Sequence, residues 1–198
     1  MRRLLLTGFE PFLDHSINPT ERIVSKLHGE TIDGYLVIGE ILPVDFGRTG
    51  QLMLDLLQKH QPDAVISLGL AAGRDRITPE RIAINCNEGP VDNKGYKPSG
   101  ERIVKNGPDG YFSKLPIYGM VQAMQDAGLP AKISNTAGAY LCNNVMYHTL
   151  HYLTENNIGI PAGFIHIPAS HELALEGNMP SWSQDDLTRA VKTAITCL

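Results

Sequence analysis

Short runs of consecutive apolar residues alternate along this chain with segments in which apolar residues recur every three or four positions. The runs span residues 3–7, 36–42 and 64–69 and are rich in Val, Ile and Leu. Such runs are typical of strands that are covered on both faces. The periodic segments between them, residues 19–27 and 48–60, predict helices. This alternation predicts βαβ units and a largely parallel sheet.

The second half of the chain continues the alternation after one long interruption. Residues 87–110 are rich in Gly, Asn, Asp, Pro and Lys, show no sustained period and predict a long loop. The elements expected around it are strands 81–85, 132–135 and 162–167 and helices 116–128, 142–155 and 183–196. We find no internal repeat and no linker. We therefore expect residues 1–198 to form a single-domain α/β/α sandwich with a twisted, largely parallel central sheet.

Composition and charge exclude several classes of partner. The formal net charge is −4 and the 17 Lys and Arg are dispersed apart from Arg2-Arg3, which argues against nucleic-acid binding. Because no apolar stretch approaches the roughly 18 residues that span a bilayer, we expect no membrane partner. The three cysteines are an odd number and lie far apart, so they predict no disulfide framework and favour the reducing cytoplasm.

Two residues stand out as candidates for chemistry. Cys142 follows a small-residue loop and opens the predicted helix 142–155, while His166 lies near the end of the predicted strand 162–167. A thiol at a helix start faces unpaired N–H groups and the positive end of the helix dipole, so we expect its pKa to be lowered. A nucleophilic cysteine and a histidine base are the two halves of a thiol hydrolase site.

A third group is normally needed to orient such a histidine. The candidate acids are Glu80, Glu88 and Asp92. Glu80 stands out because it lies between the Gly-rich turn 69–74 and the apolar segment 81–85. Asp92 is the alternative for this orienting role, and His171, on the loop after the strand, is the alternative base.

Several short motifs follow one another in a fixed order along nearly the whole chain. They are Gly8-Phe9-Glu10-Pro11-Phe12, Asn18-Pro19, the turn 69–74, residues 78–85, Asp92-Asn93, residues 134–138 with Cys142-Asn143, and Ile165-His166-Ile167-Pro168. Each motif is weak alone. Their ordered combination resembles the pyrrolidone-carboxylate peptidases, which are also called pyroglutamyl peptidase I.

This resemblance implies a cysteine peptidase that removes the N-terminal pyroglutamyl residue from peptides. Carried over residue by residue, Cys142 matches the family nucleophile, His166 the general base and acid, and Glu80 the acid that orients the histidine. The resemblance implies no metal and no organic cofactor. It also implies a homo-oligomer, a dimer or a tetramer, for which apolar side chains around Tyr96, Tyr111 and Phe112 are candidate contacts.

The substrate's lactam ring is small, flat and uncharged, so its pocket should combine apolar walls with a few backbone hydrogen bonds. The side chains that fit as walls, or that the resemblance places at the pocket, are Phe9, Phe12, Val44, Leu70, Val91, Tyr140 and Leu141. Four of them depart from the commoner family pattern: Leu70 stands where many relatives carry glutamine, Val44 where threonine is frequent, and Tyr140-Leu141 where Phe-Val is usual. Ring binding is therefore where this chain is expected to differ.

Two other functions stay open at this stage. A single-domain α/β sandwich also hosts transferases that resemble purine nucleoside phosphorylases, and fold alone does not settle function. An inactive relative that only binds pyroglutamyl peptides is the non-enzymatic alternative. Cys86 and Cys197 are expected to be small buried hydrophobic residues, and His148 and His151 are spaced too closely for the usual helical zinc pair.

Overall fold

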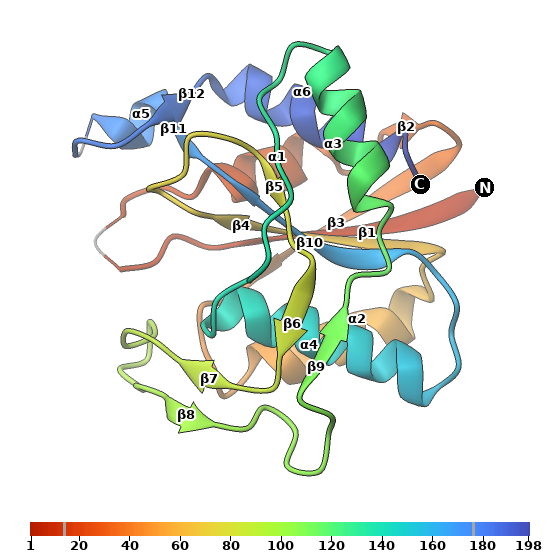
Figure 1. The fold of residues 1–198 in the computed structure, drawn as a ribbon, viewed down its shortest axis with the longest axis vertical. Helices are drawn as coiled ribbons and strands as arrows, with labels where there is room; N and C mark the ends of the chain where they lie inside the picture. The colour runs from red at the N-terminus through yellow and green to blue at the C-terminus, as the bar shows by residue number, and fades with distance from the viewer. Residues whose placement is uncertain (14, 176) are drawn as a thin grey trace.

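A six-stranded sheet lies between two layers of helices (Figure 1). The computed structural model describes residues 1–13, 15–175 and 177–198. The strand order is β2-β3-β1-β4-β10-β5. The four central strands are mutually parallel, and each of the two short edge strands is antiparallel to its neighbour. The strand bounds are β1 Arg2–Phe9, β2 Thr31–Ile32, β3 Tyr35–Leu42, β4 Ala64–Leu70, β5 Thr78–Pro79 and β10 Ala162–Ile167. The predicted α/β architecture with a largely parallel sheet is confirmed.

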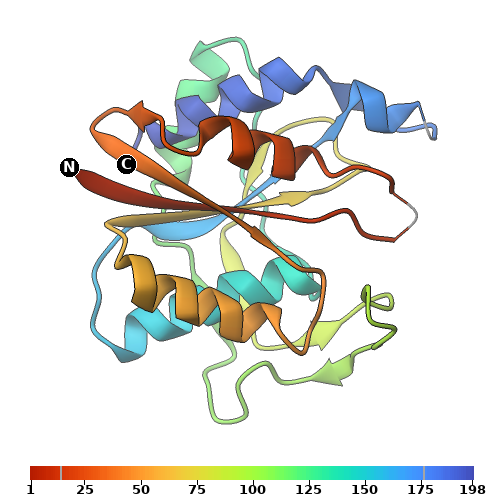
Figure 2. The same ribbon diagram turned by 180° about the vertical axis from the view of Figure 1, so that it is seen from behind.

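Helices cover both faces of this sheet, as the view from behind also shows (Figure 2). One face carries α1 Pro19–Leu27, α3 Ile117–Asp126 and α6 Gln184–Ile195, and the other carries α2 Thr49–His60 and α4 Leu141–Glu155. Successive side chains of a strand point to opposite faces, so Leu4 and Leu6 enter the first apolar core and Leu5 enters the second. Burial on both faces is why the central strands read as continuous apolar runs. No helix within the described ranges has both the length and the apolar character needed to cross a membrane.

Three pairs of short strands lie outside the sheet. They are β6 Ile82–Ile84 with β9 Gly110–Phe112, β7 Asn87–Glu88 with β8 Ser99–Glu101, and β11 Ala169–Ser170 with β12 Ser181–Trp182. A short helix, α5 His171–Ala174, follows β11. The predicted strand 81–85 therefore exists as β6 but pairs outside the central sheet. The predicted loop 87–110 contains β7 and β8.

The predicted strand 132–135 is wrong as an element of the sheet. This segment makes one isolated bridge, Ser134 with Glu80, and the residue before it, Ala131, makes another with Ile77. The place beside β10 that such a strand would fill is taken by β5, which has two residues and runs antiparallel. Proline is tolerated there because an edge strand leaves some N–H positions unpaired.

The carboxyl ends of the parallel strands meet at one edge of the sheet. The register pairs Phe9 with Leu42 and His166 with Gly69, so β1, β3, β4 and β10 end side by side. The loop after β1, the β7–β8 pair and α5 gather at this same end of the molecule (Figure 1). In open α/β sheets this edge is where ligands usually bind.

Candidate active site

His166 and Glu80 are joined by a buried hydrogen bond. The Nδ1 atom of His166 lies 2.7 Å from the Oε1 atom of Glu80. The edge strand β5 makes this contact possible, because it pairs Thr78 with His166 and brings Glu80 back toward β10 two residues later. The backbone N–H of Glu80 then donates to the carbonyl of Phe164 at 2.9 Å. The Glu80 side chain is fully buried, so its position is fixed by these contacts.

The Glu80 carboxylate is shared by a second donor. The Nη1 atom of Arg74 lies 2.6 Å from the same Oε1 oxygen. Burial by itself would raise the pKa of Glu80, but the hydrogen bond and charge of a protonated His166, followed by hydrogen bonds from Ser134 and Arg74, hold that pKa below its ordinary value. Glu80 is therefore ionised at neutral pH.

Cys142 is the second residue of α4, and its sulfur lies directly over Gly69. A Cβ atom built on Gly69 would meet Cys142 Sγ at 2.7 Å and the ring of Phe164 at 2.7 Å. Since Gly69 of β4 is paired with His166 of β10, the Cys142 sulfur lies over the strand residue next to the histidine. Asn143 fixes the start of α4 by accepting from the N–H of Ile84 at 2.8 Å and donating to its carbonyl at 2.8 Å.

The Cys142 thiol is protonated at neutral pH. Burial raises its pKa to about 12, and the Glu80 charge adds to the rise, while Arg74 and the backbone N–H of Cys142 oppose it. The lowered pKa that the sequence predicts is wrong for the free protein. The helix start favours the thiolate, but the loss of hydration in the packed site outweighs that effect.

Six of the seven expected wall residues line one hollow beside Cys142. They are Phe9, Phe12, Val44, Leu70, Tyr140 and Leu141. The sequence analysis missed a further lining residue, Asn18, whose signal was its place as the cap before Pro19. The open space between these walls is about 10 Å³, which is about what one water molecule needs.

Val91, the seventh, does not line this hollow. Its residue surface is 47% exposed. Its backbone carbonyl accepts a hydrogen bond from the Tyr140 hydroxyl at 3.1 Å. Val91 therefore contacts the pocket through its backbone, and it supports a wall instead of forming one.

The alternative residues make contacts of other kinds. Asp92 accepts hydrogen bonds from the backbone N–H groups of Phe46, Lys94 and Tyr96, each at 2.9 Å. Burial by itself would raise the pKa of Asp92, but these backbone donors lower it. The ring of His171 lies 2.9 Å from the Ser181 hydroxyl. Asp92 thus fastens the loop that carries Phe46, and His171 bonds within the β11–β12 region.

Other predicted features do not line the hollow beside Cys142. Glu88 is exposed, and Cys86 and Cys197 are partly buried free thiols. Tyr111 is not an exposed contact, because its hydroxyl bonds to His151 at 2.8 Å and its ring packs on Tyr147. Over the described ranges, no three His, Cys, Asp or Glu side chains come together as a metal site would require.

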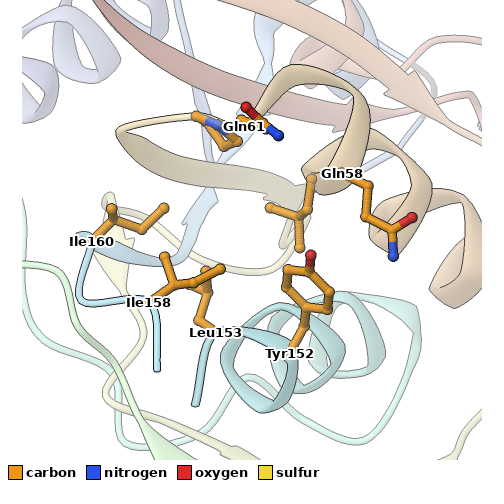
Figure 3. Close-up of a pocket in the computed structure, with 8 residues that line it drawn as sticks. Gln58, Gln61, Tyr152, Leu153, Ile158 and Ile160 are labelled. Atoms are coloured by element: carbon orange, nitrogen blue, oxygen red, sulfur yellow. The ribbon is translucent and has the colours of Figure 1, made fainter. Parts of the chain in front are cut away.

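A roomier hollow of about 330 Å³ lies at the far end of α4 (Figure 3). Gln58 and Gln61 from the end of α2, Tyr152 and Leu153 from α4, and Ile158 and Ile160 before β10 surround it. Tyr152 is ten residues along the helix from Cys142, a separation of about 15 Å. This hollow belongs to the amino ends of the strands and not to the candidate site.

The whole chain is similar to proteins of one family. A family model described as pyroglutamyl peptidase matches residues 2–198. The pyrrolidone-carboxylate peptidase of Oceanobacillus iheyensis is 63% identical over 198 residues and all of both chains, and that of Thermococcus kodakarensis is 41% identical over 98% of this chain and 94% of its own. Among solved structures, Bacillus amyloliquefaciens pyroglutamyl peptidase I superposes with a TM-score of 0.96 at 38% identity, covering 100% of this chain and 96% of that one. Pyrrolidone carboxyl peptidase from Thermococcus litoralis gives a TM-score of 0.95 at 37% identity, covering 100% and 93%.

Proposed function

Since this chain belongs to the pyroglutamyl peptidase family and is a peptidase, we propose that it hydrolyses N-terminal pyroglutamyl residues from peptides with Cys142, His166 and Glu80. Cys142 is the nucleophile, His166 the general base and acid, and Glu80 the acid that orients the imidazole. The observation that carries this proposal is the buried hydrogen bond between Glu80 and His166. His166 is paired in the sheet with Gly69, and the Cys142 sulfur lies over that glycine.

Proton transfer and attack are coupled in the first step. Because Glu80 is ionised, its carboxylate accepts a hydrogen bond from the Nδ1–H of His166, which leaves Nε2 as the basic nitrogen. The Cys142 thiol, with its pKa of about 12, gives its proton to Nε2 as its sulfur bonds to the pyroglutamyl carbonyl carbon. The imidazolium then protonates the leaving nitrogen, and the C–N bond breaks to leave a thioester.

The second half of the reaction regenerates the enzyme. Water gives a proton to Nε2 while its oxygen bonds to the thioester carbon. The C–S bond breaks, the sulfur recovers the proton from the imidazolium, and free pyroglutamate leaves. The start of α4 supports both tetrahedral intermediates, because Tyr140 makes no side-chain cap and the first N–H groups of the helix are available as donors.

The pocket beside Cys142 selects for the uncharged ring. Its walls are mainly apolar, so a ring without charge enters at low cost, whereas an N-terminal glutamyl residue would bring an ammonium group that the walls do not neutralise. With Leu70 and Val44 in place of the polar residues of many relatives, backbone groups bind the lactam N–H and C=O. The walls, which nearly close the unliganded pocket, move apart as the ring enters.

The protein is proposed to act as one catalytic domain spanning residues 1–198, in the cytoplasm, as a homodimer or homotetramer. A reducing compartment suits a reaction that needs a free Cys142 thiol. Phe112 is 68% exposed and Tyr96 is 49% exposed, and these two side chains are the apolar groups offered for subunit contact.

The test is release of a fluorescent amine from a pyroglutamyl amide by the wild type and by Cys142→Ala under reducing conditions. The matching glutamyl amide serves as the control for the ring. Turnover confined to the wild type and to the pyroglutamyl compound is expected. No turnover by either protein would favour a relative that only binds pyroglutamyl peptides, and equal turnover by both would remove Cys142 from the mechanism. Phosphate-dependent turnover of a nucleoside, unaffected by Cys142→Ala, would favour the transferase.

A further inference from the structure

We propose that Arg74 is a positioning residue for this peptidase, which holds the Glu80 carboxylate in place against the Nδ1 atom of His166. The inference rests on the proposed roles of Glu80 and His166. Its basis is that Arg74 Nη1, at 2.6 Å, and His166 Nδ1, at 2.7 Å, approach the same Oε1 oxygen. Arg74 does not touch the reacting atoms, so it acts through Glu80.

The guanidinium of Arg74 is itself held by the fold. Arg74 lies in the turn after β4, and its backbone N–H donates to the carbonyl of Ala71 at 2.9 Å. Its Nη1 atom also donates to the Thr78 hydroxyl, and that hydroxyl lies 3.4 Å from the carbonyl of His166. Arg74 therefore bonds to both ends of the β5 segment that brings Glu80 to the histidine.

Burial makes each contact that favours the charged carboxylate important, and Arg74 supplies one of them. Glu80 is fully buried, and in the part of the chain that the structure describes its Oε2 oxygen has no hydrogen-bond partner. A buried carboxylate that lacks compensating charge takes up a proton. A protonated Glu80 would present a hydroxyl, and the imidazole would then no longer be restricted to the tautomer with its proton on Nδ1. The base at Nε2 would be lost in part of the molecules.

Three titratable groups face Glu80 from three elements, and the Ser134 hydroxyl is a further, neutral contact. His166 lies on β10, Arg74 lies on the turn after β4, and Cys142 opens α4. Lys132, on the segment before α4, shares a hollow with Arg74 but is exposed. Among the residues that the structure describes, Arg74 is the Lys or Arg paired with Glu80. Because 30% of its side chain is exposed, solvent screens part of its effect.

The neighbouring Arg76 provides a matched control. It carries the same charge two residues away, but its guanidinium pairs with the exposed carboxylate of Asp75. We expect Arg74→Met to lower kcat/KM by about 10- to 100-fold, as for other residues that hold a functional side chain from behind. The loss should fall mainly on kcat, because Arg74 does not line the ring pocket. Arg76→Met should keep the wild-type values.

The pH dependence separates positioning from a general loss of structure. Without the cation, proton uptake near Glu80 is easier, so the acid limb of the kcat/KM profile should move to higher pH in Arg74→Met. Arg74→Lys keeps the charge but not the planar fork, so the limb should stay in place while part of kcat returns. If Arg74→Met does not fold, Arg74→Lys provides the test: a kcat below the wild-type value with an unmoved acid limb is expected, and a wild-type kcat would overturn the inference.

A readout that needs no turnover distinguishes failure of this inference from failure of the proposed function. In a Cys86→Ser, Cys197→Ser background, the rate of Cys142 alkylation by iodoacetamide at pH 8 reports the thiolate fraction. Arg74 favours the thiolate, so Arg74→Met should slow alkylation about threefold or more, and Arg76→Met should not. Equal alkylation rates and unchanged acid limbs in Arg74→Met and Arg76→Met would overturn the inference.

Discussion

Gly69 is the position where one added methyl group should do most damage to the reaction. A Cβ atom at this residue would lie 2.7 Å from Cys142 Sγ and 2.7 Å from the Phe164 ring. Optimal contact between non-bonded heavy atoms is about 3.5–4.0 Å. The sulfur, the ring or both must therefore move by about 1 Å in Gly69→Ala.

The expected effects follow from that displacement. Overpacking of a close-packed site costs typically about 1–3 kcal/mol of unfolding free energy. Misplacement of a reacting group by about 1 Å lowers the rate by about 100-fold. We therefore expect kcat on a pyroglutamyl amide to fall on the order of 100-fold, with a free energy of unfolding reduced by about 1–3 kcal/mol.

Gly73→Ala is the matched control for this experiment. Gly73 lies four residues further along the chain, in the turn after β4, and a Cβ atom there meets nothing within 4 Å. Its kcat should equal that of the wild type, and its stability should change by less than about 0.5 kcal/mol. Urea unfolding and initial rates on both variants provide the two measurements. A Gly69→Ala enzyme with kcat close to the wild-type value would show that the sulfur is not held against this strand.

Three further outcomes are expected from single changes. Glu80→Gln should keep the fold but lower kcat on the order of 10³- to 10⁴-fold, measured as initial rates, because an amide does not enforce the His166 tautomer; activity within tenfold of the wild type would contradict this. Burial, with a smaller effect of His151, lowers the pKa of His148 from 6.5 to about 4, so the unfolded chain binds its proton first as the pH falls. The free energy of unfolding should therefore drop by about 3 kcal/mol between pH 6.5 and 4, as measured by denaturant titration. This drop should be absent in His148→Phe. If it persisted in that variant, the assignment to His148 would be refuted. Asp92→Ala leaves three loop N–H groups without their acceptor. The free energy of unfolding should therefore fall by about 1–3 kcal/mol, and KM should rise more than kcat falls. Unchanged thermal unfolding and an unchanged KM would argue against the role of Asp92 in holding this loop.

The central strands and the main helices could be predicted because their signals are local. Burial on both faces forces the apolar runs of β1 and β4, and the caps Asn18 and Ser183 mark the starts of α1 and α6. The edge strand β5 escaped prediction because its two residues carry no period, and only pairing with β10 makes them a strand. Elements that depend on a distant partner have little signature of their own.

In the candidate site, too, the features with local signals could be predicted and those that depend on distant contacts could not. The sequence placed Cys142 at a helix start and His166 near a strand end, as the structure has them. It did not reveal that Arg74 reaches Glu80 or that the thiol pKa is raised, since both depend on packing between segments far apart in the chain. Residue type and local position therefore identified the side chains, whereas their charge states required the packed structure.

The protonated state of Cys142 also bears on how long the enzyme survives. Peroxides attack a thiolate far faster than a thiol, and disulfide exchange has the same requirement. With a pKa of about 12, only a very small fraction of Cys142 is the oxidisable thiolate at neutral pH. In the proposed mechanism the sulfur becomes reactive as His166 takes its proton during attack on the bound substrate. We therefore expect slow oxidative inactivation of the resting enzyme at neutral pH, and faster inactivation during alkaline storage.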